Sequence, residues 1–329
     1  MKKSSMADVA KLAGVSTATV SYVINGTRFV SAEVTSRVNE AIKQLGYSPN
    51  MMARSLRTKK SNAVLFVVPD VGNSFFSTAI EEVEEVLTKQ GYRLLIANTN
   101  ETMEREATHL KGINSSIVDG IILASTAEDW ECLKDILPTD LPIILLDRMF
   151  PGCNLCSVTI DCTEQIEQAI VKLAKKGHVR IGFIAGYARL STTKARVNAY
   201  RRAMERCHLM VENDFVLDGD TDYLKVQNCC DRLFELGCTA LIASNGAISF
   251  FARHVCDLRG KTLGRDVEIV GFVDAPNTDL MTEYFSTIYL PINEMARMAG
   301  EHIIKLINGQ ATLGENIQLS ASQAFRESV

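Results

Sequence analysis

The sequence has no long apolar segment and no leader-like start. Its 329 residues contain no apolar run near the roughly 20 residues that span a bilayer. No apolar stretch follows Lys2 and Lys3, as it would in a signal peptide. With 47% hydrophobic and 22% charged residues, the composition is that of an ordinary globular protein, long enough for two or three domains. We therefore expect a protein of the cytoplasm with no membrane partner.

Motifs of catalysis and of metal binding are also missing. The sequence contains no GxxxxGK(S/T) phosphate loop, no GxSxG nucleophile elbow and no histidine-based metal pair. Cys153 and Cys156 form one CxxC, but a structural zinc site needs a second pair at a matching spacing. The nine cysteines are then expected to be reduced thiols, with a redox or metal role as the alternative. We predict a protein that is not an enzyme and that has no metal or cofactor.

Net positive charge is confined to the N-terminal sixty residues. That segment holds ten Lys/Arg and three Asp/Glu, a net charge of +7, whereas the rest holds 25 Lys/Arg and 36 Asp/Glu, a net charge of −11. Basic surface attracts the phosphates of nucleic acid, and acidic surface repels them. The charge distribution therefore predicts nucleic-acid binding at the N-terminal end only.

The same segment has the pattern of a helix-turn-helix. Helices are expected over 6–12 and 17–25, with Gly14 in the turn, where glycine accepts a left-handed backbone. Ser16 is a good N-cap for the second of them. A third helix is expected over 32–45, because its apolar residues recur at helical spacing and a glycine follows its end. One outer face of the second helix carries Thr17, Ala18, Ser21 and Tyr22.

The rest of the chain alternates apolar, β-rich runs with amphipathic segments. Strands are expected at 63–68, 93–97, 120–124 and 143–146 and, after a crossing near 157–160, at 181–185, 239–243 and 267–271. Helices are expected at 76–90, 103–115, 164–176, 193–207 and 224–236, among others. Continuous apolar strands between helices indicate parallel sheets that are covered on both faces. The series is long enough for two α/β lobes, with a ligand cleft at the carboxyl ends of their strands.

Seven stretches of the sequence resemble one known family nearly end to end. They are DVAKLAGVSTATVSYVING at Asp8–Gly26, LGYSPNMMARSLRTKKS at Leu45–Ser61, PDVGNSFF at Pro69–Phe76, VDGIILAS at Val118–Ser125, LLDR at Leu145–Arg148, KKGHVRIGFIAG at Lys175–Gly186 and IVGFVDAP at Ile269–Pro276. The first two are the most specific. By these motifs the chain is similar to the lac/galactose repressor family of bacterial transcription regulators.

The resemblance implies a fold and an assembly. It implies an all-α helix-turn-helix headpiece at 1–47, a hinge helix and linker at 48–61, and a two-lobed α/β core at 62–329 similar to periplasmic sugar-binding proteins. The N-terminal lobe of that core would comprise about 62–161 and 292–319, and the C-terminal lobe about 162–291 and 320–329. The family also implies a homodimer, and the lack of a heptad-bearing tail favours a dimer over a tetramer.

The resemblance assigns DNA contacts to the headpiece. A recognition helix reads base edges in the major groove with its N-terminal residues, which here are Thr17, Ala18 and Tyr22. Tyr22 departs from the arginine that many members carry, and a surface-packing role for this tyrosine is the alternative. Because arginine pairs bidentately with guanine and tyrosine does not, the operator half-site should differ there. Expected phosphate contacts are Ser16, Thr19, Ser21, Asn25 and Ser31.

The resemblance also predicts a hinge helix. The expected DNA-binding residues of the hinge are Asn50, Ala53, Arg54, Leu56 and Arg57. So short a helix is marginal alone. In the family two such helices fold together on the minor groove, where the leucine that matches Leu56 wedges into a base step. A solvated linker is the alternative.

The effector contacts that the resemblance implies are distributed over the core. They are Phe75, Arg148, Asp161, Thr192, Arg196, Asn245 and Asp274. Other roles remain open, since Phe75 fits a core position, Asp161 fits a helix cap and Arg196 fits a surface charge. Gly246 and Val273 replace aspartates of many members, which suggests an unusual effector. Two arginines at the site leave room for an acidic or phosphorylated sugar.

The expected function follows from these parts. We expect a repressor that binds pseudo-palindromic, double-stranded operator DNA under the allosteric control of a sugar, sugar acid or sugar phosphate in the cleft. The sign of that control, induction or corepression, stays open. One alternative is a catabolite-control regulator whose core binds a phosphorylated carrier protein. A remote alternative is a sugar-processing enzyme with a fused headpiece.

Overall fold

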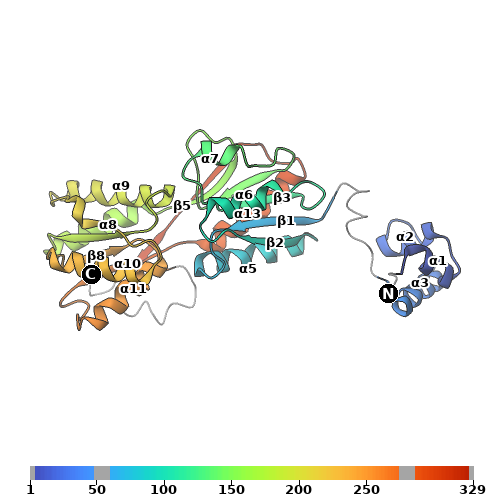
Figure 1. Ribbon diagram of the computed structural model, residues 1–329, viewed down its shortest axis with the longest axis horizontal. Coiled ribbons are helices and arrows are strands. Elements are labelled where there is room, and N and C mark those ends of the chain that lie inside the picture. The colour runs from blue at the N-terminus through green and yellow to red at the C-terminus, as the bar shows by residue number, and fades with distance from the viewer. Residues whose placement is uncertain (1–3, 48–59, 274–285, 326–329) are drawn as a thin grey trace. The chain divides into compact units, whose positions relative to one another are not determined.

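The described part of the chain in the computed structural model, residues 4–47, 60–273 and 286–325, divides into two units (Figure 1). The first unit comprises Met1–Ser61 and the second Asn62–Val329. Each unit has its own hydrophobic core, and no core cluster contains residues of both. Each is therefore described by itself.

Three helices form the N-terminal unit. They are α1 (Met6–Ala13), α2 (Thr17–Asn25) and α3 (Ala32–Leu45), close to the expected ranges. Their shared core consists of Val9, Ala10, Ala13, Val20, Val38 and Ala41. The Ser16 hydroxyl accepts a hydrogen bond from the backbone N–H of Thr19 and so caps α2, as expected. Gly14 follows α1 with φ 65°, the left-handed conformation that glycine adopts without strain.

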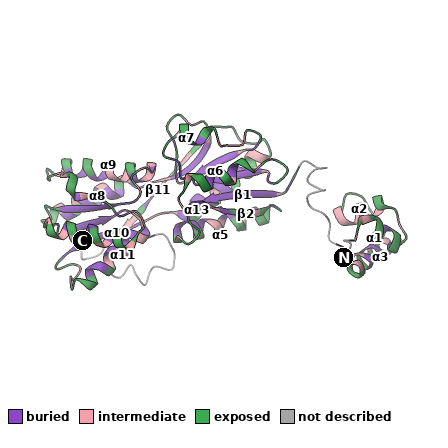
Figure 2. Cartoon of the chain, in the orientation of Figure 1, coloured by how far each residue is buried: buried purple, intermediate pink, exposed green. Residues whose placement is uncertain are grey.

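A six-stranded, fully parallel sheet forms the first lobe of the larger unit. Its strands are β1 (Ala63–Val68), β2 (Arg93–Asn98), β3 (Gly120–Leu123), β4 (Ile143–Leu146), β5 (Cys156–Asp161) and β11 (Asn316–Ser320). They are ordered β11-β5-β4-β3-β1-β2. Helices cover both faces, so β1, β3 and β4 are buried along their whole length (Figure 2).

Successive residues of β1 enter opposite cores of this lobe. Val64, Phe66 and Val68 pack with α5 (Ser74–Lys89) and α13 (Ile292–Ile307). Ala63, Leu65 and Val67 pack on the other face with α6 (Met103–Lys111) and α7 (Trp130–Lys134). This period of two explains why the apolar run at 63–68 is unbroken in the sequence.

The second lobe repeats this architecture with one reversed strand. Its strands are β6 (Ile181–Ala185), β7 (Val216–Asp218), β8 (Ala240–Ala243), β9 (Glu268–Val273), β10 (Ser286–Tyr289) and β12 (Ser322–Ala324), ordered β12-β10-β9-β8-β6-β7. Only β12 pairs antiparallel among the described strands. The helices α8 (Thr163–Lys175) and α9 (Ser191–Arg206) cover one face, and α10 (Tyr223–Glu235) and α11 (Gly246–Leu258) cover the other.

The chain passes between the lobes three times. It crosses from β5 to α8, from β10 to α13, and from β11 to β12 (Figure 1). The turns that follow β1, β2, β4, β6 and β8 contribute residues to one cleft between the lobes. This is the arrangement that open parallel sheets use for ligand binding.

The expected elements agree with the structure to within about two residues, with one exception. The helix expected over 103–115 ends at Lys111, because Gly112 follows and the chain turns there. No range is predicted from the sequence for α7, α11, α13, β5, β7, β10, β11 and β12. The short strands among them depend on packing between segments far apart in the sequence, whereas α11 and α13 are amphipathic helices of 13 and 16 residues whose pattern the sequence does contain.

Candidate functional site

The α2 helix presents its N-terminal end to solvent. Thr17 and Ala18 are exposed, whereas Ser21 and Tyr22 are partly buried on the same helix. The Ser16 hydroxyl lies 2.9 Å from the Thr19 hydroxyl as well as capping the helix. A capped helix with small side chains at an open N-terminus has the shape that enters a DNA major groove.

Tyr22 has a partner that the sequence did not indicate. The guanidinium carbon of Arg28 lies 5.1 Å from the centroid of the Tyr22 ring, in a cation–π arrangement. Arg28 is exposed and stands in the loop between α2 and α3. A guanidinium group therefore lies beside the residue that replaces the family's arginine.

Two of the expected phosphate contacts also stabilise the headpiece itself. The Asn25 amide donates to the carbonyl of Ser21 at 2.7 Å and to its hydroxyl at 3.1 Å. The Ser31 hydroxyl accepts from the N–H of Val34 and caps α3. Ser31 stands at the N-terminus of α3, where side chains and free backbone N–H groups commonly meet phosphates, and Asn25 is the last residue of α2.

Six of the predicted site residues lie outside the described part of the chain. They are Asn50, Ala53, Arg54, Leu56 and Arg57 of the hinge, and Asp274 of the effector site. Their roles stay predictions from the resemblance.

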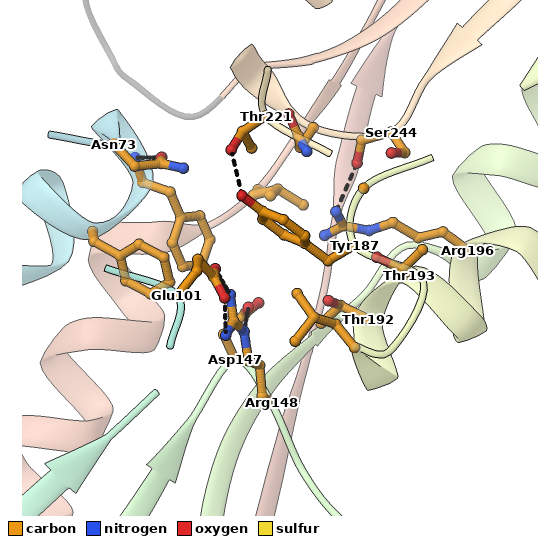
Figure 3. A pocket seen from close by; sticks show the side chains of 16 residues that line it. Asn73, Glu101, Asp147, Arg148, Tyr187, Thr192, Thr193, Arg196, Thr221 and Ser244 are labelled. Atoms are coloured by element: carbon orange, nitrogen blue, oxygen red, sulfur yellow. Dashed lines mark hydrogen bonds and ion pairs between the residues drawn. The ribbon is translucent and has the colours of Figure 1, made fainter. Parts of the chain in front are cut away.

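The larger unit contains a cleft between its lobes, with about 600 Å³ of empty space including the part open to solvent (Figure 3). Its lining includes five predicted effector residues: Phe75, Arg148, Thr192, Arg196 and Asn245. It also includes residues that we did not predict, among them Asn73, Glu101, Asp147, Tyr187, Thr193, Thr221 and Ser244. The volume and the mixed polar and aromatic lining suit a small molecule with several hydroxyl groups.

Asp161 does not line this cleft. It borders a neighbouring cavity, with about 500 Å³ of empty space, to which Asp147, Thr192 and Arg196 also contribute. Its carboxylate accepts the backbone N–H of Thr163 at 2.9 Å, so it has the local capping contact that was the alternative to ligand binding.

Arg148 is held from two sides. Its Nη2 donates to Glu101 Oε1 at 2.6 Å, and its Nη1 donates to Glu101 Oε2 at 3.3 Å and to the carbonyl of Ser125 at 2.8 Å. The side chain of Arg148 is only 6% exposed and that of Glu101 17%. A bidentate guanidinium–carboxylate pair in so dry a position fixes the orientation of both groups.

Ser125 is fixed in turn by a buried carboxylate of α6. The Glu106 side chain is fully buried and accepts from the Ser125 hydroxyl at 2.6 Å, and from the N–H and the hydroxyl of Thr126 at 2.6 and 2.7 Å. The turn after β3 therefore presents its carbonyl groups at a fixed position, including the one that holds Arg148.

Asp147 is a second buried acid in the cleft. Burial raises its pKa above the ordinary value, an effect that nearby Arg196 and Arg148 oppose. Its backbone has φ 65°, and that of Glu101 has φ 54°. Residues with a side chain rarely adopt this conformation, and such strain concentrates where function constrains the chain.

Arg196 lies on α9, on the C-terminal side of the cleft. Its Nη1 donates to the carbonyl of Ser244 at 2.7 Å, and its guanidinium carbon lies 4.7 Å from the centre of the Phe272 ring. Asn245 caps α11 by accepting from the N–H of Ile248. Phe75 is 7% exposed and makes an edge contact with Phe76, so it belongs to the core while also lining the cleft.

Most of the missed residues stand in turns directly after strands. Asp147 follows β4, Gly186 and Tyr187 follow β6, and Ser244 follows β8. Their position directly after a predicted parallel strand is the sequence signal that could have identified them, because ligands bind at the carboxyl ends of such strands. Nothing in the sequence indicated that Glu101 would reach Arg148 from the turn between β2 and α6.

The described part of the chain contains neither a cluster of metal-ligating side chains nor a membrane-spanning helix. Within the described ranges, no three His, Cys, Asp or Glu side chains gather closely enough to hold a metal ion. Among the described helices, none is long and apolar enough to cross a membrane.

Two family descriptions match the chain. Residues 61–326 match "Periplasmic binding proteins and sugar binding domain of LacI family". Residues 5–50 match "Bacterial regulatory proteins, lacI family". The two matches together span the headpiece and the whole two-lobed unit.

Individual proteins are similar over nearly the full length. Catabolite control protein A of Priestia megaterium is 28% identical over 324 residues, covering 98% of both chains. The HTH-type transcriptional regulator KdgR of Bacillus subtilis (strain 168) is 30% identical, covering 98% of this chain and 96% of KdgR. Among solved structures, the CelR–cellobiose complex has a TM-score of 0.72 at 26% identity, covering 99% of this chain and 100% of CelR. The Lac repressor bound to ONPG in the repressed state has a TM-score of 0.87 at 21% identity over 100% of both chains, a likeness of fold.

Proposed function

The chain belongs to the LacI family of bacterial regulatory proteins, and on that basis we propose that it is a repressor whose operator affinity is set by a small effector in the interlobe cleft. It is a DNA-binding transcription regulator and not an enzyme, like the regulators that it resembles over nearly their full length. The observation that carries the proposal is the cleft, in which charged and aromatic residues of both lobes line one space. We further propose that the protein works in the cytoplasm as a homodimer.

The DNA contacts proposed for the headpiece are those of α2 and its flanks. Thr17 and Ala18 would meet base edges in the major groove, because they are exposed at the N-terminal end of the helix. Tyr22 would act together with Arg28, whose stacked guanidinium supplies the paired N–H donors that a single tyrosine hydroxyl lacks. Ser16, Thr19, Ser21, Asn25 and Ser31 would contact phosphates and set the register.

The effector contacts proposed for the cleft come from both lobes. Phe75 and Arg148 belong to the N-terminal lobe, whereas Thr192, Arg196 and Asn245 belong to the C-terminal lobe. A ligand that touches both sets favours the closed arrangement of the lobes, and so it can shift the regulator between two states. The class of ligand proposed is a sugar or sugar derivative, as in the structure of CelR with cellobiose.

The hinge would carry this change to the DNA. We propose that Asn50, Ala53, Arg54, Leu56 and Arg57 act at the minor groove, with Leu56 wedged into a base step. A hinge helix that is marginal alone gives a change in the lobes a large effect on DNA affinity. Asp274 is proposed as the acidic partner of Arg196 on the ligand.

A binding-site selection followed by an effector titration tests this function. The full-length protein is mixed with a pool of random duplex DNA, and the retained sequences are expected to share a pseudo-palindrome. Affinity for that site should fall steeply with salt concentration, because phosphate contacts release counterions. A panel of sugars, sugar acids and sugar phosphates is then screened for one that changes both the melting temperature and the operator affinity.

Arg196→Ala sharpens the test. This variant should bind the selected operator as the unaltered protein does but should not respond to the effector. Retained DNA with no shared sequence would contradict the regulator function, and a normal effector response of Arg196→Ala would contradict the cleft assignment.

A second candidate function is regulation by a protein partner. It is favoured by the likeness to Catabolite control protein A over 98% of both chains. In that case a phosphorylated carrier protein, rather than a sugar alone, would raise operator affinity. Biolayer interferometry with the phosphorylated and unphosphorylated carrier protein distinguishes the two, since only the phosphorylated form should bind.

A further inference from the structure

The carboxylate of Glu101 occupies the anion-binding edge of Arg148. The two Glu101 oxygens accept from Nη2 and Nη1 of this arginine at 2.6 and 3.3 Å. A ligand carboxylate or phosphate would bind the same two donors, because that edge of the guanidinium matches two oxygens at once. The Glu101 carboxylate therefore already occupies the edge of the Arg148 guanidinium at which an acidic ligand would bind.

The other charged groups at the cleft also lie against charged partners within the protein. Among the described residues that line the cleft, Glu101 and Asp147 oppose Arg148 and Arg196. Arg189 stands beside the cleft and shares the Glu101 carboxylate with Arg148, at 3.0 Å, so this one acid is bound by two guanidinium groups. Asp147 lies 3.9 Å from Arg148 and near enough to Arg196 for the two charges to interact.

We propose that the effector is an uncharged polyhydroxylated molecule, and that Glu101 is the residue that excludes acidic and phosphorylated ligands. The inference rests on the proposed function of the cleft as the effector site and narrows the class of ligand.

The polar atoms at the site suit hydroxyl groups. Tyr187, Thr192, Thr193 and Thr221 line the cleft, and their hydroxyl groups can donate to and accept from the hydroxyl groups of a ligand. The Asp147 carboxylate lines the same cleft and offers acceptors for a hydroxyl hydrogen. An anionic ligand would instead meet two carboxylates in a poorly solvated space, where repulsion between like charges is strong.

The first experiment compares ligands that differ only in charge. The full-length protein is titrated by calorimetry with D-glucose, D-gluconate and D-glucose 6-phosphate, and with the matching sets for galactose, ribose and xylose. Within the set that binds, the neutral sugar is expected to bind about tenfold or more tightly than either anion, the ratio that one unfavourable charge contact produces. Tighter binding of an anion by the unaltered protein would overturn the proposal.

The second experiment uses Glu101→Gln, which keeps the shape of the side chain and removes its charge. The variant should gain affinity for the anionic member of the set relative to the neutral one by roughly tenfold or more, because Arg148 is then no longer neutralised. Glu104→Gln is the matched control, since Glu104 is exposed on α6 and the same charge change there should leave the ratio as it was.

The outcomes separate this inference from the function on which it rests. An unchanged ratio in a folded Glu101→Gln protein would remove Glu101 as the excluding residue and overturn the proposal. If Glu101→Gln does not fold, the comparison of neutral and anionic ligands on the unaltered protein decides the proposal alone. If no sugar of any charge binds and operator affinity never changes, the effector site itself is wrong, and the inference falls with it.

Discussion

The guanidinium of Arg189 lies 3.0 Å from the carboxylate of Glu101 and joins the two lobes across the cleft. Arg189 stands in the turn between β6 and α9, and Glu101 in the turn between β2 and α6. The same guanidinium also donates to the Glu101 carbonyl at 3.1 Å and to the Thr126 carbonyl at 3.4 Å. The lobes are thus in direct contact through the protein's own charges, and this contact favours the closed cleft.

Replacing this arginine should weaken effector binding. In Arg189→Ala the lobes lose one of their ion pairs, so a ligand that binds the closed form must itself supply the energy that this pair contributed. We expect affinity to fall roughly three- to tenfold, because the Arg189 side chain is 30% exposed and such partly solvated pairs contribute about 1 kcal/mol. Calorimetric titration measures the change. Lys194→Ala serves as the control, since the Lys194–Glu128 pair is more exposed; equal losses in both variants would contradict the role of Arg189.

Arg28 should contribute to operator recognition out of proportion to its charge. Its guanidinium is stacked on Tyr22 and is therefore held in one place before DNA binds. We expect Arg28→Ala to cost about 1–3 kcal/mol of binding and to relax the preference at one base pair of each half-site. Fluorescence anisotropy with single-base operator variants tests both effects. Arg37→Ala on α3 is the charge-matched control. If Arg28→Ala lowered the affinity equally for every operator variant, Arg28 would be a phosphate contact and not a reader of sequence.

Asp147 should make folding stability depend on pH in an identifiable direction. Burial raises its pKa in the folded protein above the ordinary 3.8, so the protonated acid folds more favourably than the anion. This contribution is fully present below pH 3.8 and is lost as pH rises through the folded-state pKa. Asp147→Asn cannot ionise, and its stability relative to the unaltered protein should therefore increase above pH 3.8 and then level off. Urea unfolding at a series of pH values measures the difference in unfolding free energy between the two proteins. A difference that does not vary with pH would contradict the raised pKa of Asp147.

Glu106 should be among the residues on which the N-terminal lobe depends most. Its buried carboxylate accepts three hydrogen bonds from Ser125 and Thr126. Glu106→Ala leaves these donors without their acceptor, which should cost roughly 2–5 kcal/mol of unfolding free energy. Chemical denaturation gives the value, and Glu104→Ala, an exposed change on the same helix, should stay within about 0.5 kcal/mol. A loss below about 1 kcal/mol for Glu106→Ala would show that the network is dispensable.

The architecture was largely predictable because it depends on local patterns. The apolar runs at 63–68 and 143–146 became fully buried strands, and the helices at 6–12 and 17–25 formed with the expected glycine and serine at their ends. Short or edge elements such as β7 and β12 escaped prediction. Their stability comes from pairing with strands that are distant in sequence, so their own residues carry little pattern.

The interlobe cleft was predictable only in part. Phe75, Arg148, Thr192, Arg196 and Asn245 line it as the resemblance implied, whereas Asp161 borders the neighbouring cavity. The resemblance could carry over residues only where the motifs matched. It could not supply the turn residues that are particular to this chain.

By itself, the sequence determined the family, the basic headpiece and the two-lobed α/β plan, because helix caps, apolar periodicity and local net charge depend on residues that are close together in the sequence. Only the tertiary structure decided which charges meet. Glu101 and Arg148 are 47 residues apart, and Glu101 and Arg189 are 88 apart. They form one cluster because two turns of one lobe and one turn of the other converge at the carboxyl ends of parallel strands, and that convergence sets the charge of the cleft.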